Sequence, residues 1–159
     1  MSDGSEGPEK AARLLSPAGA IRPTATWSVG ARAGDFVFVA GMRGIDPATN
    51  TLVDGEGARV RQAFLNMKLI AESEGARLRD AVRLVVYVTD MSRLRPLVNK
   101  VQTELWGDGP YPPRTIVEVR ALAQDDIVEV EGTFYAPQGS GIGNQESRKE
   151  HRSKNLIDP

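Results

Sequence analysis

Residues 57–90 read GARVRQAFLNMKLIAESEGARLRDAVRLVVYVTD, and the fold class follows from this stretch. In its first half, apolar side chains recur every three or four residues, which predicts a helix over residues 57–74 with one buried face. Gly75 stands where helices commonly end in a left-handed residue. The second half, AVRLVVYVTD, is rich in β-branched residues and predicts a buried strand that ends at Asp90. The buried stripe of the helix consists of Val60, Ala63, Phe64, Met67, Ile70 and Ala71.

The segment before this stretch predicts a β-hairpin. Trp27, Val29 and Ala31 alternate with polar residues or glycine, and a turn at 33–35 leads into the apolar run FVFVAG. The run is short and apolar enough for residues 36–40 to form a buried strand. The turn formers between residues 45 and 55 predict a loop or a small hairpin after it.

The segment after this stretch predicts one more helix and two more strands. The helix carries one apolar face and ends before Gly107, and Pro96 is expected in its first turn. The strands RTIVEVRAL and DIVEVEGTFYA follow, joined by a polar turn at 124–126. The order is therefore ββαβαββ, an α+β fold in which a mixed sheet carries two helices on one face. The apolar face of the second helix consists of Leu94, Val98, Val101 and Leu105.

The other face of this sheet has no cover from the chain itself, because each helix has a single apolar stripe. In the last strand Val128, Val130 and Phe134 are expected to face the helices. In the strand before it, Thr115 and Val117 are expected to face the helices, opposite residues 114 and 116. The uncovered face is then mixed and amphipathic, which suits a contact between subunits.

Length and composition predict one domain between two tails. The chain has 159 residues, of which 40% are hydrophobic and 26% are charged, enough apolar content for one core. Residues 1–19 are rich in Gly, Ser, Pro and Glu, and residues 137–159 are Gly-rich and then charged. Both segments are expected to be flexible tails around a domain at residues 20–136.

The rarest residue types exclude several kinds of chemistry. Without cysteine, a cysteine nucleophile, a disulfide and a thiolate metal site are impossible. The single histidine, His151, lies in the polar C-terminal segment, where a solvated side chain is expected rather than a ligand. Asp125 and Asp126 lie in a turn without further ligands and are expected to be solvated, so no metal is predicted. Any catalysis would use carboxylates, arginines, hydroxyls and backbone amides.

Charge and hydropathy bear on partners and location. The formal net charge is −1, from 20 Lys+Arg and 21 Asp+Glu, so electrostatics give no reason to expect nucleic-acid or membrane binding. No apolar run reaches the roughly 18 residues of a bilayer span, and the start MSDGSEGPEK lacks the order of a signal peptide. The cytoplasm is the expected location.

Arg114 and Glu129 are the pair of side chains best suited to chemistry. Because strand side chains alternate, both are expected to project from the non-helix face of neighbouring strands. A guanidinium can hold a carboxylate through two parallel hydrogen bonds, and a glutamate can orient or deprotonate a water. Spacing alone favours an ordinary cross-strand ion pair at the sheet surface.

Six motifs, taken in order, resemble the RidA/YjgF family of small trimeric imine deaminases. They span about residues 25–136 and read FVFVAG, IDPATNTLV, RQAFLNMKLIAESEGARLRDAVRLVVYVTDM, LVNKVQTELW, YPPRTIVEV and VEVEGTFYA. The most specific part is the PPRT-V-EV segment, followed at the family spacing by an EVE strand.

This resemblance implies a fold, an assembly and a reaction. The implied fold is chorismate-mutase-like, and three copies pack their sheets into a central barrel with a cleft between each pair of neighbours. Typical members hydrolyse reactive 2-enamino or 2-imino acids to 2-oxo acids and ammonia without a cofactor. The implied partners are a small-molecule carboxylate substrate and two further copies of the chain.

The resemblance also assigns roles to residues. Arg114 matches the arginine that binds the substrate carboxylate, and Glu129 matches the glutamate that orients the hydrolytic water. Gly41 matches a glycine whose backbone lines the pocket, Asn99 a cleft-lining asparagine, and the backbone at Ile116 a main-chain contact to the ligand. Because a protonated imine carbon is already electrophilic, a placed water and a fixed carboxylate suffice.

Three substrate-binding positions depart from the family pattern. Trp27 stands where deaminating members usually carry tyrosine, Ala40 replaces a common serine, and Ile116 replaces a common cysteine. The pocket is therefore expected to be less polar and differently shaped. Besides a deaminase of small imino acids, two alternatives stay open. One is a deaminase of a larger enamine, such as an aminomuconate-type product of aromatic catabolism, and the other is a non-catalytic trimer that binds small carboxylates.

Overall fold

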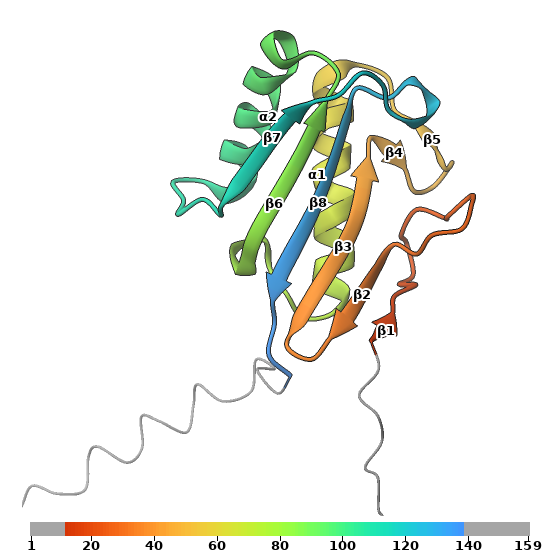
Figure 1. Ribbon diagram of the computed structural model, residues 1–159, viewed down its shortest axis with the longest axis vertical. Helices are drawn as coiled ribbons and strands as arrows, with labels where there is room; N and C mark the ends of the chain where they lie inside the picture. Colours follow the sequence, from red (N-terminus) through yellow and green to blue (C-terminus); the bar gives the residue numbers. More distant parts are fainter. Residues whose placement is uncertain (1–11, 139–159) are drawn as a thin grey trace, which may run out of the picture.

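The computed structural model describes residues 12–138, and in these residues two helices pack on one face of a six-stranded sheet (Figure 1). The principal elements are β2 (Gly30–Ala33), β3 (Phe36–Arg43), α1 (Glu56–Ser73), β6 (Ala81–Val88), α2 (Met91–Trp106), β7 (Arg114–Glu118) and β8 (Val128–Tyr135). The minor ones are β1 (Arg13–Leu14), the hairpin of β4 (Ile45–Asp46) and β5 (Thr51–Leu52), and the short 3-10 turns η1 (Leu78–Asp80) and η2 (Ala123–Asp125). The α+β class and the ββαβαββ order of the principal elements are confirmed.

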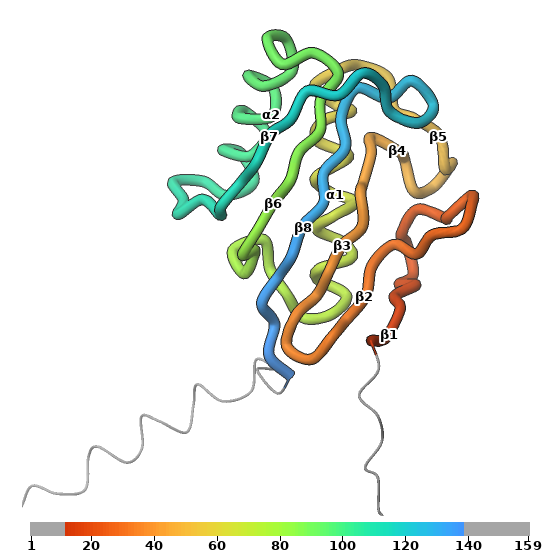
Figure 2. The backbone as a smooth tube through the Cα atoms, in the orientation of Figure 1, coloured from red at the N-terminus to blue at the C-terminus, as the bar shows by residue number. Residues whose placement is uncertain are grey.

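The sheet is mixed, with strand order β1-β2-β3-β8-β6-β7. Among the strands of residues 12–138, only β6 and β7 pair in parallel, from Leu84 opposite Arg114 to Val88 opposite Glu118. A parallel pair needs a crossover, and Figure 2 shows the chain leaving β6, passing through α2 and returning along β7. In the strand order, β7 stands last and lies at one edge of the sheet.

Helix α1 forms the centre of the core as predicted. All six residues of its apolar stripe are fully buried. At its end the Ala76 N–H donates to the Ala71 carbonyl and the Gly75 N–H to the Glu72 carbonyl, while Gly75 has a φ of 81°. This is the Schellman arrangement, whose left-handed residue glycine adopts without strain.

Helix α2 buries Leu94, Val98 and Val101 as predicted, whereas Leu105 is only half-buried. The prediction for Pro96 was wrong, because this residue lies in the second turn of the helix. Its missing N–H leaves the carbonyl of Ser92 without a helical donor, and the exposed position of Ser92 lets water take that role. No helix in residues 12–138 is both long and apolar enough to cross a membrane.

The folded domain begins earlier than predicted. Arg13 and Leu14 pair with β2 opposite Arg32 and Ala31, and Leu15 is only 5% exposed within the core. The predicted N-terminal tail therefore includes residues that belong to the sheet, because a two-residue edge strand carries no periodicity to detect. Residues 1–11 and 139–159, including His151, lie outside the described residues.

Two smaller predictions in the loops were also wrong. Trp27 precedes β2 instead of belonging to it. Asp126 is buried and not solvated. Its carboxylate accepts hydrogen bonds from the N–H groups of Gly44 and Ile127, and its Oδ1 lies 3.7 Å from Arg59 Nε. Its carboxylate thus ties the turn before β8 to the end of β3.

The face of the sheet opposite the helices, which we call the open face, carries exposed aromatic rings. In β8, Val128, Val130 and Phe134 are buried as predicted. The strand predicted at residues 36–40 is buried on one side only, because Phe36 and Phe38 are 40% and 44% exposed. The rings of Phe36 and Tyr135 lie 5.5 Å apart, and those of Phe36 and Phe38 lie 6.4 Å apart. An exposed aromatic cluster of this kind marks an interaction surface.

Candidate active site

The side chains of β7 point to the opposite faces from those predicted. Ile116 packs against the core and Val117 is exposed, so Arg114, which alternates with Thr115, lies on the helix side. Both alternate sets of this short edge strand contain an apolar residue, so alternation alone could not choose between them. The crossover through α2 decides the orientation.

Arg114 is a half-buried cation held by neutral groups. Its Nη1 donates to Asn99 Oδ1 at 2.9 Å and to Gln102 Oε1 at 2.8 Å, both on α2. Burial, with a smaller effect of Arg95, lowers the pKa of Arg114, although an arginine stays protonated near neutral pH. Within residues 12–138 no carboxylate lies within ion-pair distance of it, whereas Arg32 is paired with Glu74. Such a guanidinium is suited to an anion from outside the chain.

A hollow of about 400 Å³ opens beside this guanidinium. Of its lining residues, the sequence predicted Asn99 and Arg114. Gln102 was missed, although a polar residue one turn after Val98, on the apolar face of α2, is a detectable signal. We call this hollow the arginine pocket, and its lining consists of Asn99, Gln102, Thr103, Tyr111, Pro112 and Arg114.

The backbone at Ile116 also lies at this edge of the sheet. The Leu84 N–H donates to the Pro113 carbonyl, and the Val119 N–H donates to the Val88 carbonyl. Because alternate residues of a parallel strand bond to the same neighbour, the odd-numbered residues of β7 face β6. The N–H and C=O of Ile116 therefore point away from the sheet, on the free edge that also holds Arg114.

Glu129 lies on the open face, close against Gly41. A Cβ on Gly41 would lie 2.8 Å from Glu129 Cδ and closer still to Oε1, so no other residue fits there without moving the carboxyl group. The ladder between β3 and β8 is irregular between Val39 and Met42, and this places Ala40 and Gly41 in a bulge over Glu129. Arg43 pairs directly opposite Glu129 across the same two strands. We call Ala40, Gly41, Arg43 and Glu129 the glutamate cluster.

The environment of Glu129 favours its protonated form. Burial raises the pKa of Glu129, nearby Arg43 lowers it, and Asp126 and Glu131 raise it, with a net upward shift. Arg43 is held in place by hydrogen bonds to the Ala123 carbonyl at 2.6 Å and to Gln124 Oε1 at 3.0 Å. A raised pKa makes the carboxyl group a stronger base, and a glutamate can both accept and return a proton during a reaction.

Trp27 belongs to the glutamate end of the sheet and not to the arginine pocket. The Val29 carbonyl, two residues after Trp27, accepts a hydrogen bond from the Ala40 N–H at 3.0 Å. The Trp27 ring is partly exposed. Of the predicted substrate-binding residues, Gly41 lies against Glu129 with Ala40 beside it, Trp27 precedes the strand next to Ala40, and Asn99 and Ile116 lie near Arg114.

Within one chain these two groups do not meet. Arg114 stands opposite Leu84 and Glu129 opposite Tyr87 on the intervening strand β6, which places their Cα atoms about 14 Å apart. Their side chains also point to opposite faces. The prediction that both project from one face of neighbouring strands was wrong. Strand β6 lies between β7 and β8, and the side chains of β7 point to the opposite faces from those predicted.

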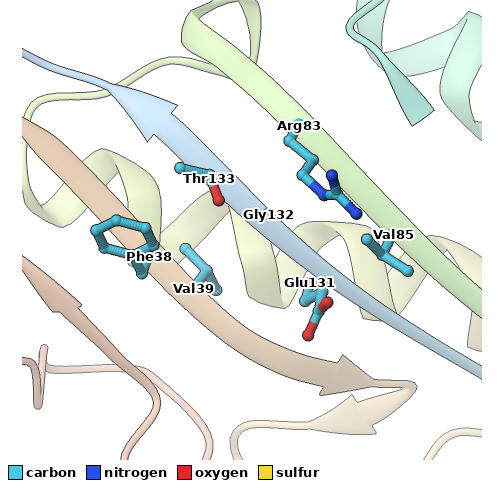
Figure 3. A pocket seen from close by; sticks show the side chains of 7 residues that line it. All are labelled: Phe38, Val39, Arg83, Val85, Glu131, Gly132 and Thr133. Atoms are coloured by element: carbon cyan, nitrogen blue, oxygen red, sulfur yellow. The ribbon is translucent and has the colours of Figure 1, made fainter. Parts of the chain in front are cut away.

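A second, smaller hollow of about 220 Å³ lies on the open face and contains none of the predicted residues. Figure 3 shows Arg83 from β6 and Glu131 from β8 projecting on this face, near Phe38 and Thr133. The Tyr87 hydroxyl donates to Glu131 Oε1 at 3.2 Å, and burial together with Glu131 raises the pKa of Tyr87. Among the described residues, no three His, Cys, Asp or Glu side chains group closely enough to hold a metal.

Comparison with known proteins places this geometry in a family. The family model Endoribonuclease L-PSP matches residues 18–136. A solved structure of a probable translation initiation inhibitor from Rhodopseudomonas palustris is 56% identical with a TM-score of 0.78, covering 80% of this chain and 99% of that one. The structure of RidA from an Antarctic Psychrobacter is 33% identical with a TM-score of 0.73, and the match covers 77% of this chain and 98% of that one. A 2-iminobutanoate/2-iminopropanoate deaminase of Dermatophagoides farinae is 31% identical over 120 residues, 75% of this chain and 92% of that protein.

Proposed function

Because this chain belongs to the YjgF/RidA/RutC family, we propose that it is a homotrimeric deaminase of reactive 2-enamino and 2-imino acids. The observation that carries the proposal is Arg114, a half-buried guanidinium that only neutral amide oxygens hold among the described residues. A 2-imino acid offers the carboxylate that this cation lacks. The relative named as a 2-iminobutanoate/2-iminopropanoate deaminase supports the same substrate class.

The proposed binding step uses the arginine pocket. The substrate carboxylate pairs with Arg114 through charge-assisted hydrogen bonds, and the outward N–H of Ile116 donates a further one. These contacts fix the position of the imine carbon relative to the edge of the sheet. The attacking water and the imine carbon then meet in one defined geometry.

The proposed chemical step needs one water and one carboxyl group. An enamine first takes a proton on its β-carbon and becomes the protonated imine. The Glu129 carboxylate accepts a proton from water as the water oxygen bonds to the imine carbon. It then returns this proton to the nitrogen, and the new hydroxyl group gives its own proton to Glu129 as the carbon–nitrogen bond breaks, which leaves a 2-oxo acid and ammonia. No oxidant or reductant takes part.

Glu129 must come from a second copy in this proposal, since within one chain it lies on the other face of the sheet from Arg114. The open face, with Phe36, Phe38 and Tyr135, is the surface that a neighbouring copy would cover. Contact between the free edge of β7 and a neighbour's glutamate cluster would bring Arg114 and Glu129 together. A cyclic trimer repeats that contact three times.

The size of the arginine pocket also suits a larger substrate. Its volume of about 400 Å³ lies within the range of ordinary ligand pockets. Tyr111 lines it with an exposed ring, and Trp27, a second partly exposed aromatic residue, precedes the strand that pairs with β3. These features favour an enamine with a bulky or aromatic-derived side chain as the second candidate substrate, with the same roles for Arg114 and Glu129.

Ammonia release tests the proposal. Imines of 2-oxopropanoate and 2-oxobutanoate are generated by a pyridoxal-phosphate enzyme in the same cuvette, and a panel of bulkier enamino acids is run in parallel. We expect turnover of at least one class and its loss in Arg114→Ala, with full activity in the exposed-surface control Arg79→Ala. Equal rates in Arg114→Ala and the unmutated protein would overturn the assignment. Carboxylate binding without ammonia from any imine would identify a binding protein instead.

A further inference from the structure

We propose that Gln102 is a positioning residue that commits Arg114 to bind its ligand through the Nε–Nη2 edge of the guanidinium. The identity of the ligand, a 2-imino acid or the corresponding 2-oxo acid, rests on the proposed function. The role of Gln102 rests on the hydrogen bonds around Arg114.

The geometry leaves one edge of the guanidinium free. An arginine can grip a carboxylate end-on through Nη1 and Nη2, or side-on through Nε and Nη2. Nη1 carries two hydrogens, and two acceptors, Asn99 Oδ1 and Gln102 Oε1, lie within 2.9 Å of it. Nε and Nη2 have no acceptor among the described residues. The end-on grip would require breaking a bond to α2, whereas the side-on grip requires none.

Gln102 is the more rigid of the two acceptors. Its side chain is 5% exposed, whereas Asn99 is exposed. Because arginine only donates hydrogen bonds, the amide oxygen of Gln102 must be the atom that faces Nη1. A neutral amide also fixes the guanidinium without neutralising its charge, which a glutamate at this position would do. The pocket therefore keeps both a fixed edge and a full positive charge for the ligand.

A double-mutant cycle with Gln102→Met and Arg114→Lys tests this role. Methionine keeps the approximate length of the side chain and removes the acceptor. Lysine keeps the positive charge, but its ammonium group lacks the flat edges by which a guanidinium binds a carboxylate. Gln62→Met is the matched control, because it removes an amide hydrogen bond, to Asn66 on α1, away from the pocket. The readouts are the Kd for 2-oxobutanoate, by calorimetry or ligand-observed NMR, together with kcat, KM and Tm.

We expect Gln102→Met to weaken 2-oxobutanoate binding about tenfold when Arg114 is intact and to have little effect in the Arg114→Lys background. KM should rise with kcat nearly unchanged, because the carboxylate contact is made in ground and transition states alike. Gln62→Met should leave Kd unchanged. Equal weakening in both backgrounds, or no weakening when Arg114 is intact, would overturn the inference.

The same measurements separate this inference from the proposed function. If the unmutated protein binds 2-oxobutanoate but releases no ammonia, the proposed function fails and the cycle still decides the role of Gln102. If the unmutated protein is active and Gln102→Met binds as tightly, only the role of Gln102 fails. If the unmutated protein neither binds nor turns over, both fail.

Discussion

Arg114 and Glu129 lie on opposite faces of one sheet, with strand β6 between the strands that carry them. Arg114 is held against α2, and Glu129 lies over Gly41 on the open face. A single chain therefore carries two separate groups of candidate site residues. In the proposed assembly the two groups meet across the contact between two copies.

Replacing Gly41 by alanine should displace Glu129 without unfolding the protein. The added methyl group would lie 2.8 Å from Glu129 Cδ, and the side chain must rotate away from it. Because small misplacements of a reacting group reduce rates steeply, we expect kcat to fall about a hundredfold. Steady-state ammonia release measures this. Gly57→Ala is the control, since the same methyl group meets no neighbouring part of the chain within 4 Å there; a normal kcat in Gly41→Ala would contradict the placement of Glu129.

The pH profile should depend on Arg43. The base form of Glu129 is the carboxylate, so the rate falls as pH falls through its pKa. A raised pKa places this limb above the roughly pH 4.3 of an ordinary glutamate. Arg43 lowers that pKa, so Arg43→Met should move the acidic limb of kcat/KM to higher pH. Arg43→Lys keeps the charge and should leave the limb near its original position, and a limb that is identical in all three proteins would refute the role of Glu129 as base.

The stability of the domain should depend on Arg32. This buried guanidinium donates to Glu74 Oε2 at 2.7 Å and to the carbonyls of Gly34 and Ala136. Arg32→Met leaves Glu74 without its buried partner and should reduce the free energy of unfolding by about 3–5 kcal/mol. Urea denaturation at matched protein concentration measures this, with Arg79→Met as the exposed control.

The same pair gives this stability a pH dependence. Burial alone would raise the pKa of Glu74, but hydrogen bonds from Arg13 and Arg32 outweigh it and lower the pKa overall. A lowered folded pKa gives stability that is present above the unfolded pKa and lost as pH falls through the folded one. The difference between Arg32→Met and the unmutated protein should therefore shrink in acid. A difference that stays constant down to the acid transition would show that Glu74 is not the linked group.

Sequence periodicity predicted the elements that bury a long, one-sided stripe. Helix α1 has six buried apolar positions over five turns, so its limits and its C-terminal glycine followed directly. Strand β7 has five residues and an apolar residue on each face, so its orientation depends on where α2 lies and not on its own pattern. Strand alternation singled out Arg114 and Glu129 and the resemblance to the family gave them roles, but only the three-dimensional register revealed that they lie apart.

Gln102 and Arg43 are the candidate site residues that were not predicted from the sequence. Gln102 occupies an apolar position of α2, and its partner is known only once β7 is placed beside that helix. Arg43 stands opposite Glu129 because a bulge shifts the register of β3. Such bulges depend on contacts distant in the sequence, which no local pattern encodes.

Mixed trimers test the central claim most directly. Arg114→Ala and Glu129→Gln are co-expressed with different tags, and trimers that carry both tags are purified and assayed for ammonia release. Each variant alone should be inactive. If the site is shared between copies, a trimer with two copies of one variant and one of the other keeps both residues intact at one of its contacts, so activity returns to about one third of the unmutated level. Mixed trimers as inactive as either parent would contradict a site built from Arg114 of one copy and Glu129 of the next.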